Sequence, residues 1–156
     1  MTNPTARPAG RPSIVQERLM PAAPEVVFAA WSDAEAMAAW MCPGADMAAS
    51  SVELDFRVGG GFRIVMHAAE QDYPHRGEFL EIDPPKRLVL TWVSEWMPED
   101  ERATRVAVSF EPAGPDQTRL VLVHDHLPAG PGYDGHADGW ATILHKLAAS
   151  LEPEER

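Results

Sequence analysis

Two histidines separated by a single residue, His124 and His126, have the spacing best suited to chemistry. Residues i and i+2 of a β-strand share a face, so both imidazoles can point to the same side. A neutral imidazole can take up a proton near pH 7, which makes His124 a candidate general base beside a cavity. Together with His136 the pair could also form a three-histidine metal site. The metal site is the less favoured interpretation, because His126 can already lie in the loop before Pro128, and we predict no metal site.

Glu81 is the second candidate for moving protons. Glu78 and Glu81 lie three residues apart in a predicted strand, so alternation places one on each face. A carboxylate that faces an apolar cavity can act as an acid or a base, although a surface carboxylate is the commoner outcome. The only cysteine, Cys42, has no neighbouring base and is expected to be a stray thiol. Phosphate-binding glycine loops, dinucleotide fingerprints and the G-x-S-x-G motif do not occur.

Four tryptophans, Trp40, Trp92, Trp96 and Trp140, fall on faces that are expected to look inward. Aromatic side chains dominate ordinary protein cores, and that explanation alone accounts for them. The alternative is the wall of a cavity that holds a planar or lipophilic ligand. Both interpretations remain open. Tyr73 either offers a phenol to such a ligand or borders a turn.

Composition narrows the class of protein. The chain has 156 residues, of which 45% are hydrophobic, and 13 basic against 24 acidic residues give a net charge of −11. We therefore expect one domain with one core, no nucleic-acid partner and no attraction to an anionic membrane. A single cysteine excludes an intrachain disulfide. With no apolar run of about 18 residues and no secretory leader, the expected location is the cytoplasm.

The pattern of apolar residues predicts strands and helices in an informative order. A Pro-rich lead-in over 1–12 is expected to be disordered, 13–152 to form the domain, and 153–156 to fray. A strand over 13–20 precedes two short helices, the second starting at a Ser32–Glu35 capping box and ending at Pro43 and Gly44. Six further strands are predicted over 52–57, 62–67, 77–82, 87–96, 105–111 and 118–126.

The predicted elements combine into an α+β fold. Short turns between consecutive strands, one of them at Gly59–Gly61, favour an antiparallel meander. The final helix, over 134–151, carries an apolar stripe that can cover the concave face of a curved sheet. The stripe consists of Trp140, Ile143, Leu144, Leu147 and Leu151. We predict a helix-grip fold, in which the sheet wraps around this long C-terminal helix and two short helices follow the first strand.

Five segments resemble motifs of a known family in the same order. Val27–Glu35 resembles V-F-x-A-W-T-D-P-E, Gly59–Arg63 resembles P-G-G-x-[WF]-R, and Gly77–Trp92 resembles G-x-[VF]-x-E-I-x-P-P-x-R-L-V-[FL]-T-W. Thr118–Pro128 resembles T-x-L-T-L-x-H followed by L-P, and Gly135–Trp140 resembles G-H-x-x-G-W. These motifs are typical of the family named for the activator of heat-shock-protein-90 ATPase, in the START/polyketide-cyclase (SRPBCC) superfamily.

The sequence departs from that family at two places. Ala39–Gly44 replaces the frequent W-W-G-P, and His126 stands where the family usually has a glycine two residues after its histidine. Both places are expected near the mouth of the cavity, so no ligand preference is carried over.

The resemblance implies an apolar cavity between the sheet and the C-terminal helix. We expect a small hydrophobic or aromatic ligand, no cofactor, and a monomer or a homodimer. A cyclase, dehydratase or hydrolase that uses His124 or Glu81 and a co-chaperone-like module remain alternatives. The predicted ligand-binding residues are Trp40, Met41, Phe62, Met66, Tyr73, Phe79, Trp92, Trp96, Val108, Leu122, His124, Trp140, Ile143 and Leu144.

Overall fold

The structure, a computed structural model, describes residues 13–42, 48–97, 99, 103–126 and 131–152. The predicted lead-in over 1–12, the tail over 153–156 and the helix end at Pro43 and Gly44 lie outside these residues. Within α3, side chains are described from Ala137 onward.

Seven strands form a single antiparallel sheet in the order β1-β7-β6-β5-β4-β3-β2. Consecutive strands β2 to β7 are neighbours, as in a meander, and β1 closes the far edge by pairing with β7. The strands are β1 (Ile14–Met20), β2 (Ser51–Leu54), β3 (Gly61–His67), β4 (Asp72–Asp83), β5 (Arg87–Ser94), β6 (Ala103–Pro112) and β7 (Thr118–Asp125). The helices are α1 (Pro24–Ser32), α2 (Ala34–Trp40) and α3 (Pro131–Leu151).

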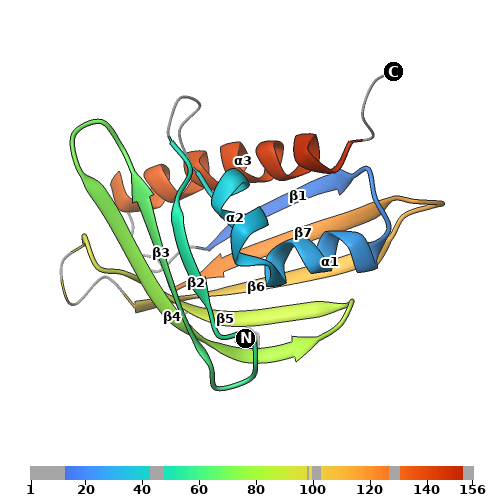
Figure 1. Ribbon diagram of the computed structural model, residues 1–156, viewed down its shortest axis with the longest axis horizontal. Coiled ribbons are helices and arrows are strands. Elements are labelled where there is room, and N and C mark those ends of the chain that lie inside the picture. Colours follow the sequence, from blue (N-terminus) through green and yellow to red (C-terminus); the bar gives the residue numbers. More distant parts are fainter. Residues whose placement is uncertain (1–12, 43–47, 98, 100–102, 127–130, 153–156) are drawn as a thin grey trace, which may run out of the picture.

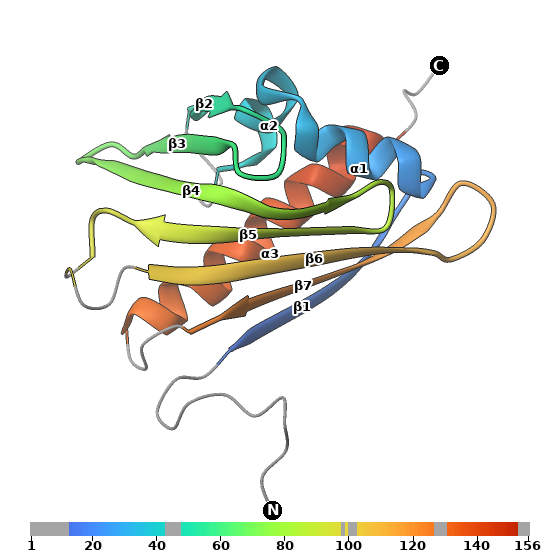
Figure 2. The ribbon, with the colours of Figure 1, turned by 90° about the horizontal axis from the view of Figure 1, so that it is seen from below.

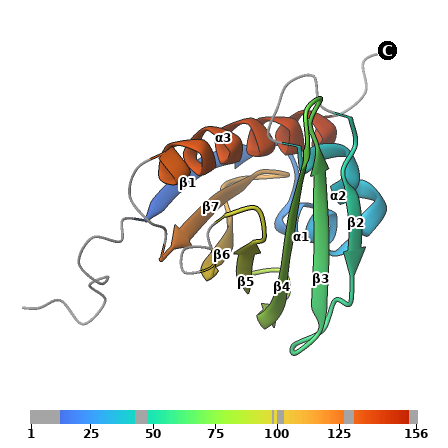
Figure 3. The same cartoon turned by 90° about the vertical axis from the view of Figure 1, so that its left-hand side faces the viewer.

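All three helices lie on the concave side of the sheet (Figure 1). Seen from below, α3 runs obliquely behind the sheet from β7 to beyond β4, and α1 and α2 lie near its C-terminal part and β2 (Figure 2). The end view shows how the sheet curves around the helices (Figure 3). The predicted helix-grip fold is confirmed. Trp140, Ile143, Leu144 and Leu147 are buried and Leu151 is partly buried, so the predicted stripe does face the core.

The start of α2 differs from the prediction by one residue. Asp33, not Ser32, is the N-cap, and its carboxylate accepts from the N–H groups of Glu35 (3.0 Å) and Ala36 (3.4 Å). Ser32 still belongs to α1, and its hydroxyl donates to the Ala29 carbonyl oxygen at 2.9 Å. A serine inside a helix bonds to the preceding turn, so the extended residue Asp33 takes over the cap.

Of the strand boundaries that differ from the prediction, three affect predicted site residues or motifs. β4 begins at Asp72 rather than 77, because the hairpin with β3 continues as far as the pair His67 and Asp72. β5 ends at Ser94, which leaves Trp96 outside the strand. β7 ends at Asp125, and His126 follows with a φ of 68°. That left-handed conformation favours glycine, which is the residue expected there from the family motif.

Two glycines are required by their surroundings. Gly59, in the predicted turn between β2 and β3, has a φ of 86°, a conformation that favours glycine. Gly77 lies where a Cβ would collide with the Thr91 carbonyl oxygen and with the ring of Phe62. The absence of a side chain at Gly77 therefore lets β4 pass close to β5 while the Phe62 ring stays seated in the core.

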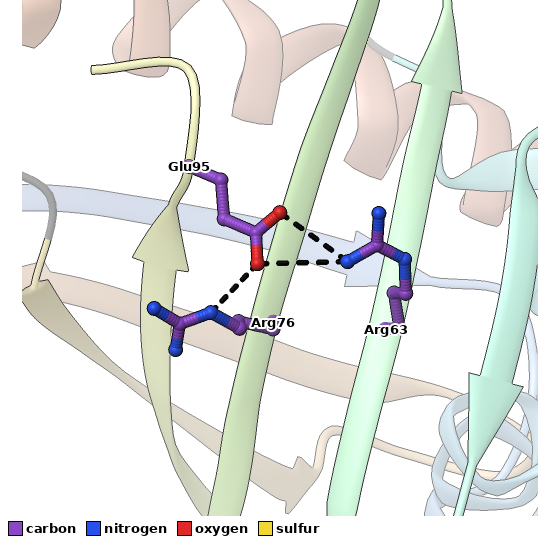
Figure 4. Close-up of polar contacts among 3 residues, drawn as sticks. All are labelled: Arg63, Arg76 and Glu95. Carbon is purple, nitrogen blue, oxygen red and sulfur yellow. Dashed lines mark hydrogen bonds and ion pairs between the residues drawn. The ribbon is translucent and has the colours of Figure 1, made fainter.

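The convex side of the sheet carries ion pairs. Glu95, at the end of β5, receives Arg76 Nε at 2.6 Å and Arg63 Nη1 at 3.2 Å (Figure 4). Near the β1 edge of the same face, Arg119 donates hydrogen bonds to the carboxylates of Glu17 and Glu111, and these bonds raise the pKa of Arg119. Because the arginine side chains are about half exposed, such pairs contribute little to stability.

Candidate functional site

His124 lies at the centre of a buried chain of hydrogen bonds. The indole N–H of Trp140 on α3 lies 2.9 Å from His124 Nδ1, and His124 Nε2 lies 2.7 Å from the hydroxyl oxygen of Thr104 on β6. The same hydroxyl lies 2.5 Å from the carbonyl oxygen of Trp92 on β5. His124 is fully buried, and Thr104 and Trp140 are almost fully buried.

The partners determine where the proton of His124 sits. An indole N–H can only donate, so Nδ1 of His124 must be the acceptor and Nε2 must carry the hydrogen. Nε2 then donates to the Thr104 oxygen, whose own hydrogen goes to the Trp92 carbonyl. Both ring nitrogens of His124 are therefore occupied by the protein. This arrangement ties β5, β6, β7 and α3 together and leaves His124 no lone pair for a substrate.

Glu81 does not face the interior. The register between β4 and β5 shifts between Phe79 and Glu81, which is the signature of a β-bulge. The extra residue removes the alternation on which the prediction depended, so Glu78 and Glu81 are both exposed. Glu81 pairs with Arg87, with a distance of 3.3 Å between the Glu81 Oε1 and Arg87 Nε atoms. Glu81 thus takes the surface position, and the predicted placement of Glu78 and Glu81 on opposite faces is wrong.

The interior contains a small apolar hollow of about 10 Å³. A space of this size holds about one water molecule. Among the described residues, its walls come from α1, the α2 region and strands β2 to β5, and none comes from α3. This hollow thus lies under the two short helices, whereas the predicted cavity lies between the sheet and the C-terminal helix. The lining residues are Trp31, Met37, Met41, Leu54, Phe62, Ile64, Phe79, Leu88, Leu90 and Trp92.

Three buried indole N–H groups beside or near this hollow have no hydrogen-bond acceptor within the described part of the chain. They belong to Trp31, Trp40 and Trp92, and each of these side chains is only 2% exposed. Trp31 and Trp92 line the hollow, and the ring of Trp40 packs edge-on against Trp31 at a centroid distance of 4.8 Å. A buried donor without an acceptor costs about 1–3 kcal/mol. Such groups are rare in native proteins and often mark a place for a missing partner.

The predicted ligand-binding residues occupy three places. Met41, Phe62, Phe79 and Trp92 line the hollow. Tyr73 and Trp96 lie away from it, with Trp96 38% exposed and its indole N–H donating to His75 Nε2 at 3.0 Å. The expectation that Trp96 faces inward is wrong, because β5 ends before it. The other predicted residues are buried in the surrounding core, namely Trp40, Met66, Val108, Leu122, His124, Trp140, Ile143 and Leu144.

Sequence reasoning did not assign Trp31 or Met37 to the site. Both lie on the short helices, and the helical spacing of Val27, Phe28 and Trp31 already indicated an inward face. His75 was also missed. Its strand had been predicted to start at Gly77, so its alternation was not considered. His75 is 3% exposed and packs against Trp92 at a centroid distance of 5.0 Å.

The three histidines considered for a metal site differ in position. His124 is bonded within the core, His126 leaves β7 with its positive φ, and the side chain of His136 lies outside the described residues. Within the described ranges, no group of three histidine, cysteine or acidic side chains is arranged to hold a metal ion. In the same part of the chain, no helix combines the length and apolar character needed to span a membrane.

Comparison with protein families gives a match over residues 21–152 to the Activator of Hsp90 ATPase homolog 1-like protein family. The match includes all the helices, six of the seven strands in full and every predicted site residue. The comparison with curated proteins finds no match.

Solved structures share the whole fold. Protein CV1439 from Chromobacterium violaceum is 25% identical, with a TM-score of 0.78 over 91% of this chain and 98% of its own. Mll3558 protein from Rhizobium loti is 27% identical, with a TM-score of 0.75 over 90% of this chain and 97% of its own. PFC0360w, an HSP90 activator from Plasmodium falciparum, is 25% identical, with a TM-score of 0.71 over 89% of this chain and 95% of its own.

Proposed function

Since the chain belongs to the Activator of Hsp90 ATPase homolog 1-like family, in which a ligand-binding or a co-chaperone-like role is expected, we propose that it binds a small aromatic ligand. The observation that carries this proposal is the set of unpartnered indole N–H groups of Trp31, Trp40 and Trp92. The ligand occupies the space between the short helices and strands β2 to β5. Trp92 connects this space to the part of the core that packs under α3, where its ring lies 5.2 Å from that of Trp140.

The walls of the hollow define the chemistry of the ligand. All the lining side chains are apolar or aromatic, so a charged ligand would lose its hydration without gaining a counter-ion. The indoles offer donors and no acceptors. The matching ligand is therefore uncharged, flat and apolar, and it carries a carbonyl or ether oxygen that accepts from an indole.

The ligand must enlarge the hollow when it enters. Met37 and Met41 form part of the wall, and methionine side chains adapt readily because they are unbranched and flexible. The helix that carries Met37 has seven residues, and β2, which it covers, is a four-residue strand at the edge of the sheet. Short peripheral elements are the ones that open at low free-energy cost. Displacement of α2 and its methionines thus makes room without disturbing β5 to β7.

A matched pair of probes tests the proposal. We expect 2-acetylnaphthalene to bind, and to bind about 10-fold more tightly than 2-ethylnaphthalene, because only the ketone offers an acceptor worth about 1.4 kcal/mol. Tryptophan fluorescence or native mass spectrometry gives both affinities. Trp31→Phe should reduce the preference for the ketone. Trp140→Phe is the control, because the Trp140 N–H already donates to His124. Equal affinities for both probes, or no binding of either, would contradict the proposal.

A second candidate function is a co-chaperone-like role. The similarity to an HSP90 activator over most of both chains favours it. We expect such a role to appear as faster ATP hydrolysis by a cognate Hsp90 when this protein is added. An unchanged rate at saturating concentration would exclude that role and would leave ligand binding unaffected.

A further inference from the structure

Three polar side chains on the convex side of the sheet form a second hydrogen-bonded row, separate from the interior site. His67 Nδ1 lies 2.9 Å from Asp72 Oδ1, and His67 Nε2 lies 2.8 Å from Ser51 Oγ. We propose that these residues form a hydrolytic site for small esters, with Ser51 as the nucleophile, His67 as the general base and Asp72 as the residue that orients the base. Serine hydrolase sites on unrelated folds share this geometry and not a sequence position.

The partners of His67 determine its tautomer. An ionised carboxylate can only accept a hydrogen bond, so Nδ1 of His67 carries the hydrogen that goes to Asp72. Nε2 then has a free lone pair, and the bond to Ser51 requires the serine hydroxyl to donate. The nucleophile therefore already points its proton at the base, which is the arrangement needed for attack.

Backbone pairing holds the three residues in place. His67 and Asp72 are direct partners across β3 and β4, and the turn beyond them is closed by the Ala68 N–H donating to the Gln71 carbonyl oxygen at 3.0 Å. Ser51 faces Val65, so it is diagonal to His67. Side chains at opposed and diagonal positions of a sheet are within reach of one another. The row thus rests on a strand ladder and not on a loop.

A substrate can reach this row. Ser51 and Asp72 are exposed, and the His67 side chain is 35% exposed. An open groove of about 290 Å³ begins at Glu53, two residues from Ser51 on the same face of β2, and runs to Asp55 and Arg63. Arg63, one wall of the groove, is held by Glu95 (Figure 4). The acyl or alcohol part of a small ester fits along this groove.

A backbone donor lies next to the nucleophile. The Ser50 N–H donates to Ala38 on α2, and the Asp55 N–H donates to Gly61 on β3. Because N–H directions alternate along a strand, the N–H of Val52 points away from β3, toward the edge of the sheet. The residue after a nucleophilic serine often supplies an N–H to the developing oxyanion. Val52 is in the position to do this.

The reaction proceeds in two balanced steps. Ser51 Oγ attacks the ester carbonyl carbon while its proton moves to His67 Nε2, and the alcohol leaves with that proton. A water molecule then attacks the acyl-serine, His67 takes the water proton and returns it to Ser51 Oγ, and the carboxylic acid departs. The sum is one ester plus water giving one acid and one alcohol, with no further reactant.

The experiment measures hydrolysis of p-nitrophenyl acetate by the full chain. Ser51→Ala and His67→Gln should each lower kcat/KM by about 100-fold, since a positioned general base contributes at least that much. Asp72→Asn should lower it by at least about 10-fold through loss of the correct tautomer. Diisopropyl fluorophosphate should add one diisopropylphosphoryl group to the peptide that contains Ser51, and His67→Gln should slow this labelling.

Matched controls separate this site from background hydrolysis by surface histidines. His145→Gln changes another exposed histidine, which accepts from Arg18 at 3.0 Å, and Ser32→Ala changes another serine, which is partly exposed. Neither control should alter the rate. If the Ser51→Ala variant keeps the rate of the unchanged protein, or if the reagent labels residues other than Ser51, the proposal is wrong. Thermal melts that match the unchanged protein verify that each variant folds.

Discussion

His124 and His67 lie on opposite faces of the sheet, and each carries its hydrogen on a different ring nitrogen. His124, on the concave side, accepts at Nδ1 from an indole and donates from Nε2 to Thr104. His67, on the convex side, donates from Nδ1 to a carboxylate and accepts at Nε2 from Ser51. The difference shows that a histidine's capacity for proton transfer depends on its hydrogen-bond partners. The indole donates to a ring nitrogen of His124 and so occupies its lone pair. The carboxylate accepts from a ring nitrogen of His67, and the lone pair of the other nitrogen stays available for a proton.

The same contrast separates the tryptophans. Trp140 has an acceptor in His124, whereas Trp31, Trp40 and Trp92 have none. Among the described residues, the indole N–H on α3 is therefore paired, whereas the indole N–H groups beneath α1 and α2 are not. We expect the core beneath α3 to contribute more to the stability of the fold, and the core beneath α1 and α2 to rearrange more readily around a ligand.

The largest expected effect comes from removing the interior histidine. His124→Leu leaves the Trp140 N–H and the Thr104 hydroxyl without their partner in a dry environment, so the free energy of unfolding should fall by about 3 kcal/mol. His67→Leu, on the partly exposed side, should change it by less than about 0.5 kcal/mol. Urea denaturation measures both. Similar losses for the two variants would contradict the division between a structural and an accessible histidine.

A smaller effect is expected at the hydroxyl groups next to these histidines. Thr104→Val keeps the shape of the side chain but removes the partner of His124 Nε2 and of the Trp92 carbonyl, which should cost about 2 kcal/mol. Ser51→Ala should be neutral within about 0.5 kcal/mol. The midpoints of urea unfolding give the comparison, and a neutral Thr104→Val would show that the buried chain is not needed for stability.

The two classes of tryptophan should differ by a smaller amount still. Trp140→Phe and Trp31→Phe remove similar volumes from the core, but only the first also removes a hydrogen bond. We expect Trp140→Phe to be the more destabilising by about 1 kcal/mol, and Trp31→Phe to be compensated in part by the loss of an unpaired buried donor. Thermal unfolding of both variants at one pH tests this. The reverse order would show that the Trp31 N–H has an acceptor after all.

The subtlest test leaves stability unchanged and observes the tautomers directly. Nitrogen-15 NMR at neutral pH should show hydrogen on Nε2 of His124 and on Nδ1 of His67, as their partners require. Asp72→Asn should shift the His67 equilibrium toward the Nε2 tautomer without altering His124. Identical nitrogen shifts for the two rings would remove the basis of the comparison.

Much of the fold was predictable because it depends on local periodicity. Alternating apolar residues marked the strands, and the stripe from Trp140 to Leu147 marked the face of α3. The strand features that were predicted incorrectly have a common cause. The β-bulge after Phe79 and the extension of β4 to Asp72 are properties of a strand pair, and neither leaves a signal within a single strand. Similarly, Asp33 displaced Ser32 as the cap because α1 continued one residue further.

The candidate sites were less accessible to such reasoning. His124 was singled out from its spacing, but its partner Trp140 comes from a helix, 16 residues further along the chain. The sequence pattern did not indicate Ser51 as a nucleophile, because no catalytic motif surrounds it and its candidate base, His67, lies on the next strand. The unpaired indoles could not be recognised either, since whether a donor finds an acceptor depends on the packing of several elements.

The amino-acid sequence by itself determined the order of strands and helices and the face that each turns to the core, because these follow from side-chain polarity read at short range. Its motifs also identified the family to which the chain belongs. Only the tertiary structure decided that His124 is buried with both ring nitrogens hydrogen-bonded and that His67 is accessible to a substrate. Hydrogen-bond partners come from strands and helices far apart in the chain, and the identity of the partner, donor or acceptor, sets the state of each ring.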